Sequence, residues 1–398
     1  MKKSRLGECK PDLFAVIKAQ IAEAEKTGGK LIPLAVGQPS GVAYAGASRA
    51  AAKAVRSGGE EMHMYQDAGS PGVPDFAKRF VKCHVDCDLD WHGAQVDFLP
   101  LAGIKSSLHM VILASRTPGL RLKVMTMTHP GYGVPATWCR QYLPDFIDHF
   151  ESVTNPGNKF LFNPETDLWS LDEGLLMVNY PHAPSGQIAT RAWWKGVCDV
   201  CQRKQIRIFN DAAYSVLAHD RAHSALADVA VNYPELSWAE AFSASKALGN
   251  TTGWRVGALV GSRDFVEDIR TVKTSDDAGF VAFAAAGVIS AFEQHFEWIV
   301  ENRRKYELRL ELLIDCLQSQ GMRLALVPKA GFFTLWHTPK LAFGQSISSA
   351  EQFNYLMLER VRIFGVPFEP YVRYSVAGDI DEHIPQISEA FRKAEVSY

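Results

Sequence analysis

Short apolar runs alternate with helix-periodic segments through the middle of the chain. The runs lie at residues 96–101, 121–127, 175–179, 207–210, 239–242 and 256–260. Apolar residues at helical spacing fill the intervals, as at 105–114 and 192–204. Strands that alternate with helices are typical of an α/β fold with a mostly parallel sheet sandwiched by helices. Because ligands bind beyond the carboxyl ends of such strands, we expect functional residues just after the apolar runs.

The last third of the chain follows a different pattern. Apolar positions at helical spacing predict one long helix over residues 291–318,. A smaller α+β domain should follow, with strands at 324–327, 331–336 and 371–377 and a helix at 350–362,. A first helix at 11–26 is expected to pack on this domain or on a partner subunit. The prediction is an N-terminal arm (1–45), a large domain (46–290) and a small domain (291–398).

The composition argues against several classes of partner. The 398 residues include 42 basic and 44 acidic side chains, so the net charge of -2 favours neither nucleic acid nor an anionic membrane surface,. Charged residues interrupt the N-terminus before any secretory signal forms, and no apolar run is long enough for a membrane span,. The seven cysteines have no disulfide-framework spacing, which favours reduced thiols in the cytoplasm,.

Two groups of cysteines are candidates for a metal site. Cys83, Cys87 and the neighbouring histidines are close in sequence, and Cys198 and Cys201 form a CxxC pair. A structural zinc site needs four well-spaced ligands, and the CxxC pair falls inside a predicted helix, where thiols commonly belong to the core. We therefore expect no metal.

The most informative segment is Ser243-Ala244-Ser245-Lys246, followed nine residues after the lysine by Arg255. Two hydroxyls and a planar guanidinium suit a phosphate dianion. An amine beside a phosphate site is what pyridoxal 5'-phosphate requires, because the amine forms a Schiff base with the cofactor aldehyde. The alternative is a Ser-rich turn before a strand, since motifs this short also occur without a function.

Other segments that follow predicted strands support the same chemistry. Asp211 could pair with a protonated pyridine nitrogen, or simply cap the next helix,. Tyr132 could stack on a planar ring or pack in its turn,. The helix that opens at 101–107 offers free amides to a phosphate, and Arg373 in an apolar strand requires a carboxylate from a substrate or an ion pair,. Each motif alone is weak, but their joint order favours a cofactor site.

These motifs together make the chain similar to fold-type I pyridoxal-phosphate enzymes of the class I/II aminotransferase family. The resemblance runs from residues 34–39 to the strand that holds Arg373. It implies that Lys246 forms the Schiff base, that Asp211 pairs with the pyridine nitrogen, that Tyr214 bonds the ring hydroxyl and that Tyr132 stacks on the ring. It also implies that the phosphate is held by Ser243, Ser245, Arg255 and the backbone amides of Gly103, Ile104 and Lys105.

The resemblance further implies a substrate site and an assembly. Arg373 would bind the substrate α-carboxylate, with the Gly37 backbone close by, and Tyr65 would reach the phosphate of the other subunit in a homodimer with shared active sites. The implied reaction moves an amino group between an α-amino acid and a 2-oxo acid by a ping-pong mechanism. Side-chain selection stays open, because four residues could line the pocket or belong to the core: Trp336, Phe332, Tyr44 and His63.

The sequence departs from the family pattern in three places. Ala183 stands where the family carries the Asn that bonds the ring oxygen, which leaves Asn179 or His182 as candidate donors. The interval from Lys246 to Arg255 is one residue longer than usual, and the segment 365–370 is short. Two alternatives therefore stay open: another pyridoxal-phosphate reaction on the same fold, such as a lyase or synthase, and a non-catalytic ligand-binding descendant.

Overall fold

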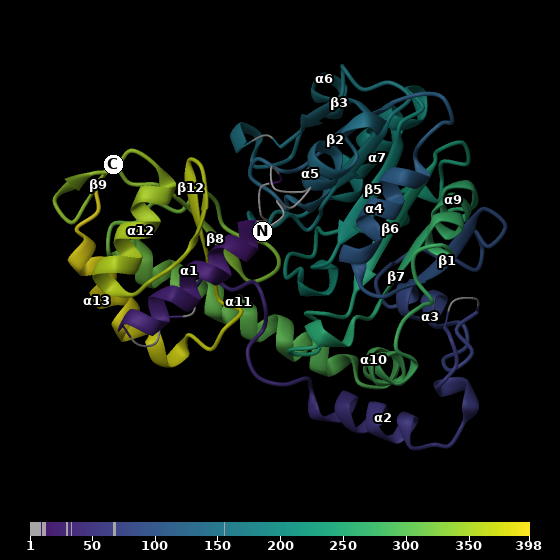
Figure 1. Ribbon diagram of the computed structural model, residues 1–398, viewed down its shortest axis with the longest axis horizontal. Coiled ribbons are helices and arrows are strands. Elements are labelled where there is room, and N and C mark those ends of the chain that lie inside the picture. The colour runs from purple at the N-terminus through teal and green to yellow at the C-terminus, as the bar shows by residue number, and fades with distance from the viewer. Residues whose placement is uncertain (1–8, 10–12, 29–30, 33, 67–68, 155) are drawn as a thin grey trace, which may run out of the picture.

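The computed structural model describes residues 9, 13–28, 31–32, 34–66, 69–154 and 156–398. The chain forms a large α/β domain and a smaller domain, which the long helix α11 (Phe296–Ser319) joins (Figure 1). Helix α1 (Leu13–Gly28) lies against the smaller domain, on the side of α12 (Ala350–Val361) (Figure 1). The part of the predicted first helix at residues 11–12 lies outside the described residues.

A seven-stranded sheet forms the centre of the large domain. Its strand order is β1-β7-β6-β5-β4-β2-β3, and all strands run parallel except β7, which is antiparallel to both of its neighbours. The predicted mostly parallel sheet is therefore confirmed. The strands are β1 (Val96–Leu101), β2 (Leu122–Thr126), β3 (Ile147–Ser152), β4 (Leu175–Val178), β5 (Arg207–Ala212), β6 (Trp238–Ser243) and β7 (Gly257–Ser262).

Helices cover both faces of this sheet, because successive residues of a strand point to opposite sides. On β4, Leu175 and Met177 pack with α4 and α9, whereas Leu176 and Val178 join the core that includes α3, α7 and α10. All four residues are buried, as expected for a central parallel strand,. The helices of this domain are α2 (Ala45–Val55), α3 (Phe76–Lys82), α4 (Ile104–Ala114), α5 (Val134–Thr137), α6 (Pro164–Asp167), α7 (Arg191–Arg203), α8 (Ala227–Ala230), α9 (Arg263–Lys273) and α10 (Ala282–Gln294).

The sequence pattern did not predict edge strand β3. Its residues Asp148, His149 and Glu151 are polar and exposed, so β3 lacks the continuous apolar run of the central strands. Charged side chains on an edge strand discourage pairing with other chains. The polar pattern that hid this strand is therefore a consequence of its position in the sheet.

The smaller domain is built on an antiparallel sheet of three strands. The order is β11 (Val366–Phe368), β12 (Tyr371–Ser375) and β8 (Phe333–His337), and helices α11, α12 and α13 (Ile384–Ala394) complete the domain. A separate two-stranded ribbon pairs β9 (Leu341–Ala342) with β10 (Gln345–Ser346).

Two predictions for this region were wrong. The single long helix expected at 291–318 is two helices, α10 and α11, which break at His295. His295 has φ -141°, outside the helical region, although the apolar spacing continues across the break,. Residues 324–327 contribute only an isolated bridge between Leu324 and Trp336 rather than a strand.

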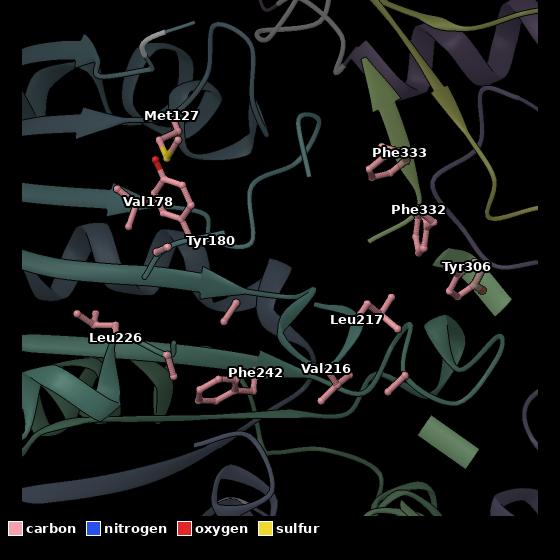
Figure 2. Packing of buried hydrophobic residues seen from close by; sticks show 14 of the residues in the cluster. Met127, Val178, Tyr180, Val216, Leu217, Leu226, Phe242, Tyr306, Phe332 and Phe333 are labelled. Atoms are coloured by element: carbon pink, nitrogen blue, oxygen red, sulfur yellow. The ribbon is translucent and has the colours of Figure 1, made fainter. Parts of the chain in front are cut away.

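The two domains share one continuous hydrophobic core. Buried residues from the sheet side, such as Val178 and Phe242, and residues that contact the smaller domain, such as Phe332 and Tyr306, belong to the same cluster (Figure 2). Leu217 is part of this cluster, near its middle in the view of Figure 2. Burial of apolar area across the junction stabilises the position of β8 relative to the sheet.

In the described residues, no helix is long and apolar enough to cross a membrane.

Two glycines inside helices should respond in opposite ways to alanine. A Cβ on Gly287 of α10 would lie 2.6 Å from the Ala47 carbonyl of α2, whereas one on Gly196 of α7 would meet only Pro164, at 3.8 Å. We expect Gly287→Ala to destabilise the protein by about 1–3 kcal/mol through overpacking. Gly196→Ala should stabilise it by about 0.5–1 kcal/mol through helix propensity. Melting temperatures of the two variants check the sign; a gain for Gly287→Ala would contradict the close packing of α2 and α10.

Candidate active site

A cavity of about 290 Å³ opens at the carboxyl ends of the central strands. It is bounded by the large sheet, by β8 and β12 of the smaller domain, and by the N-terminal arm. Most residues given cofactor or substrate roles from the sequence line this cavity. They are Gly37, Ile104, Lys105, Tyr132, Asp211, Tyr214, Ser243, Ser245, Lys246, Arg255 and Arg373.

Asp211 lies near the end of β5, where the strand leaves the sheet. Its carboxylate accepts a hydrogen bond from the Ala213 amide at 3.2 Å, and its backbone carbonyl accepts one from the Asn179 side chain at 2.6 Å. Burial raises the pKa of Asp211 to about 6, and the nearby Lys246 amine only partly opposes that shift. A buried carboxylate of this kind gains stability when a cation is placed beside it.

Lys246 follows β6 and points its amine into the cavity. The Nζ atom lies 5.0 Å from the centre of the Tyr214 ring. Asn302 of α11 donates hydrogen bonds to the carbonyls of Lys246 and Ala247 at 3.0 and 3.1 Å, which fixes the backbone at the lysine. Burial lowers the pKa of Lys246, so more of the amine is in the neutral, nucleophilic form,.

The groups suited to an anion gather at the start of α4. Arg255 donates hydrogen bonds to two backbone carbonyls at 3.0 and 3.3 Å, which orients its guanidinium. Gly103 precedes α4 with φ 78°, and a Cβ there would lie 2.3 Å from the guanidinium, so only glycine fits,. The Ser243 hydroxyl accepts from the Ser245 amide at 3.1 Å. Guanidinium, hydroxyls and a helix N-terminus together suit a phosphate.

Arg373 lies on β12, across the cavity from the large sheet, and its side chain is buried. It donates a hydrogen bond to the Ala35 carbonyl at 2.9 Å, and its guanidinium lies 4.1 Å from the centre of the Phe333 ring. Burial lowers the pKa of Arg373 to about 10. A carboxylate bound here would offset part of the cost of burying the charge.

The structure does not bring every candidate residue into the cavity. Tyr65 is 77% exposed and lies outside the cavity of its own chain. Trp336 and Phe332, considered as pocket residues, belong to the core instead, and Tyr44 stacks on Trp298 with the ring centres 3.8 Å apart. His63, the remaining candidate, is exposed and likewise does not line the cavity.

Both residues suggested as substitutes for the missing Asn at position 183 already make other hydrogen bonds. Asn179 lines the cavity, but its amide donates to the Asp211 carbonyl and its oxygen accepts from the Ala183 amide at 3.0 Å. His182 is buried and does not line the cavity; its Nδ1 lies 2.7 Å from the Ser185 hydroxyl, and its Nε2 has no hydrogen-bond partner among the described residues. Ala183 itself lines the cavity and offers no side-chain donor.

Five residues of the cavity wall carry no clear signal in the sequence. They are Lys18, Val36, Gln38, Phe333 and Phe368. Three come from the N-terminal arm and its helix and two from strands of the smaller domain, so only tertiary packing brings them together. Val36 and Gln38 flank Gly37, which was predicted to lie at the substrate site, so their place in the cavity wall could have been expected.

The charges of the side chains that line the cavity match those of pyridoxal 5'-phosphate and an amino acid substrate. Five of the described residues that line it are cationic, and Asp211 is the one carboxylate among them. Cations held together in a partly buried site favour anionic ligands. A phosphate at Arg255 and a carboxylate at Arg373 would balance much of this charge, and Asp211 would balance a pyridinium. The residues present therefore fit this cofactor.

Within the residues that the structure describes, no three His, Cys, Asp or Glu side chains gather closely enough to hold a metal ion. Cys198 and Cys201 lie on α7 and are buried in the core, where burial raises the pKa of both thiols.

Residues 29–391 match the sequence pattern of the aminotransferase class I and II family. The chain belongs to this family. It is accordingly a pyridoxal-phosphate-dependent aminotransferase, which transfers an amino group between an α-amino acid and a 2-oxo acid. The prediction from the sequence motifs is confirmed at this level.

Individual relatives resemble this aminotransferase over nearly its full length. An LL-diaminopimelate aminotransferase of Methanocaldococcus jannaschii is 29% identical over 91% of this chain and 84% of its own. One of Syntrophobacter fumaroxidans is 28% identical over 99% of this chain and 98% of its own. The structure of an aspartate aminotransferase from Rhizobium meliloti superposes with a TM-score of 0.83 at 20% identity, and the match covers 100% of both chains. This last likeness concerns the fold.

The raised pKa of Asp211 predicts a pH dependence for the cofactor-free aminotransferase. An unfolded Asp titrates near pH ~3.9, whereas folded Asp211 titrates near about 6. Protonation therefore stabilises the fold below the lower value, and this stability is lost as pH rises through the folded pKa. Asp211→Asn removes the carboxylate that causes this loss of stability. The gain in folding free energy over the unmodified protein should therefore be larger at pH ~7.5 than at pH ~4, by up to about 3 kcal/mol.

Melting temperatures at the two pH values check this prediction. Asp220→Asn is the control, because Asp220 pairs with Lys329 at 2.7 Å, which lowers its pKa and gives an effect of opposite sign,. The same shift for Asp211→Asn at both pH values would contradict an uncompensated carboxylate in the cavity.

Proposed function

We propose that this aminotransferase uses Lys246 as its cofactor lysine, Asp211 as the partner of the pyridine nitrogen and Arg373 as the binder of the substrate α-carboxylate. The observation that carries the proposal is the shared cavity, in which the lysine and the arginine approach from different domains. Ser243, Ser245 and the start of α4 beside Gly103, Ile104 and Lys105, with Arg255, hold the phosphate, and Tyr132 and Tyr214 contact the ring.

The residues of the cavity divide the work of the reaction. When bound, pyridoxal phosphate supplies an aldehyde that joins the amino nitrogen and a ring that withdraws electrons from the substrate Cα. Asp211 keeps the ring nitrogen protonated, because a carboxylate in this buried position strongly favours a cation beside it,. Arg373 orients the substrate through its carboxylate. Lys246, with its lowered pKa, takes the Cα proton at Nζ and returns it, as base and then as acid,.

The proposed working form is a homodimer with shared active sites. Tyr65 is exposed and outside the cavity of its own chain, so its contribution to a phosphate site would have to be made to a partner subunit. Other exposed apolar side chains, such as Val42 and Met64, lie in the same stretch of the chain,. The seven cysteines, free of disulfides in the described structure, favour the cytoplasm as the compartment,.

The covalent assignment is tested with borohydride. We expect the purified protein to be yellow with pyridoxal phosphate, and borohydride to fix a pyridoxyl group on Lys246 that peptide mass spectrometry locates. Lys105 lines the same cavity and is the internal control, since it should stay unlabelled. Lys246→Ala should bind the cofactor without this label and lose more than about a thousandfold in turnover, because the base of the proton transfer is removed. Label on Lys105 or on another lysine instead would refute the assignment.

The amino donor is the open part of the function. LL-diaminopimelate, the substrate in the names of the relatives above, is the first donor to test, with a 2-oxo acid as acceptor. Nitrogen should pass from donor to acceptor in equal amounts. Release of ammonia in place of that exchange would indicate the alternative lyase chemistry.

The alanine at position 183 predicts an altered cofactor spectrum. Without an amide donor the anionic form of the ring oxygen is less stabilised, so Ala183→Asn should lower the pH at which the visible absorbance changes, by about one unit. A spectroscopic titration measures this directly, and Ala183→Leu is the control, since it adds volume without a donor. An unchanged midpoint in Ala183→Asn would show that the ring oxygen is satisfied by another group.

A further inference from the structure

Lys18 is a cation of the cavity wall that the chemistry described above does not use. It belongs to α1, far in sequence from the cofactor motifs, yet it lines the same cavity as Arg373 and Lys246. Ile17, the preceding residue, fixes the position of Lys18, because Ile17 is buried in a cluster with Ala35 of the N-terminal arm. One face of α1 is therefore held on the smaller domain while the adjacent side chain faces the cavity.

No ion pair on its own helix accounts for Lys18. Residues three and four positions away on a helix are its neighbours, and in this chain those positions hold Phe14, Ala15, Ile21 and Ala22,. By contrast, Lys26 of the same helix pairs with Glu23 at 3.0 Å. Lys18 therefore has no acidic side chain within reach along α1.

The other cations of the cavity have proposed partners. Arg255 and Lys105 lie at the phosphate site, Lys246 at the amino nitrogen, and Arg373 at the substrate α-carboxylate. Since Asp211 is the one carboxylate among the described lining residues, Lys18 is the cation left without an anion. Lys18 is exposed, and it lines the cavity from the side of α1.

The wall beside Lys18 is suited to the aliphatic part of such a side chain. Phe333 and Phe368 flank Arg373, with ring centres 4.1 and 5.8 Å from its guanidinium, and Val36 adds apolar surface. Apolar walls reduce the screening of a nearby charge by water. A substrate with a short methylene chain and a terminal carboxylate would meet the apolar surface and the cation together.

We infer that Lys18 binds the distal carboxylate of a dicarboxylic amino acid and so selects this class of substrate. The inference rests on the proposed function, because the distal group is defined by an α-carboxylate held at Arg373. Lys18 is a specificity residue in this account and takes no part in proton transfer.

The test compares two ligands that differ in one charge. Glutarate and valerate have the same chain of five carbons, with two carboxylates and one, and neither has an amine to react. In calorimetric titrations of the pyridoxal-phosphate-loaded protein we expect glutarate to bind about tenfold more tightly than valerate, a ratio that falls as salt is raised. Lys18→Gln should remove most of that difference and leave valerate within about twofold.

Two variants control for charge and for the helix. Lys18→Arg keeps the cation and should keep the preference for glutarate, whereas Lys26→Gln changes a paired lysine on the same helix and should have no effect. The same series with norleucine and 2-aminoadipate as donors should show the loss in KM of the dicarboxylic donor, with kcat little changed.

The outcomes separate this inference from the proposed function. Equal binding of glutarate and valerate by the unmodified protein, no binding of either, or equal loss of both in Lys18→Gln would overturn the role of Lys18. Absence of amino transfer with every donor would instead overturn the residue roles proposed above, while the binding comparison would still decide about Lys18.

Discussion

The structure depends on one electrostatic constraint: opposite charges are held in a cavity that water only partly solvates. Burial alone raises the pKa of Asp211 and lowers that of Lys246, so each group is poised away from its ordinary state,. A ligand that places a cation beside Asp211 and an aldehyde at Lys246 would stabilise both side chains. The free energy lost on burying these side chains during folding is thus recovered in part when the cofactor binds.

The sheet fixes the geometry of this constraint. Strands β5 and β6 are parallel neighbours, so their carboxyl ends deliver Asp211 and the segment leading to Lys246 to the same edge,. Behind them, Asn210 donates to the buried Glu240 at 2.7 Å and to the Tyr180 carbonyl at 3.0 Å. This network ties the loop that holds Ala183 to the two strands, and its burial protects it from competition with water.

Local motifs were readable from the sequence, and long-range contacts were not. Lys246 with its serines, and Asp211 at the end of an apolar run, are short signals whose meaning depends on one strand and one loop. Lys18 gives no such signal, because it reaches the cavity only through the packing of α1 on another domain. The break at His295 was missed for a related reason: the apolar stripe continues through it, while the backbone does not.

The alanine at position 183 shows how far the site departs from the family pattern. The Asn179 side chain already joins Asp211 to Ala183, and His182 does not line the cavity. The phenol of Tyr214 also lines the cavity, and burial raises its pKa. A phenol that keeps its proton is a better hydrogen-bond donor than a phenolate. We therefore expect Tyr214 to be the main donor to the ring oxygen in this chain, in place of the Asn that the family carries at position 183.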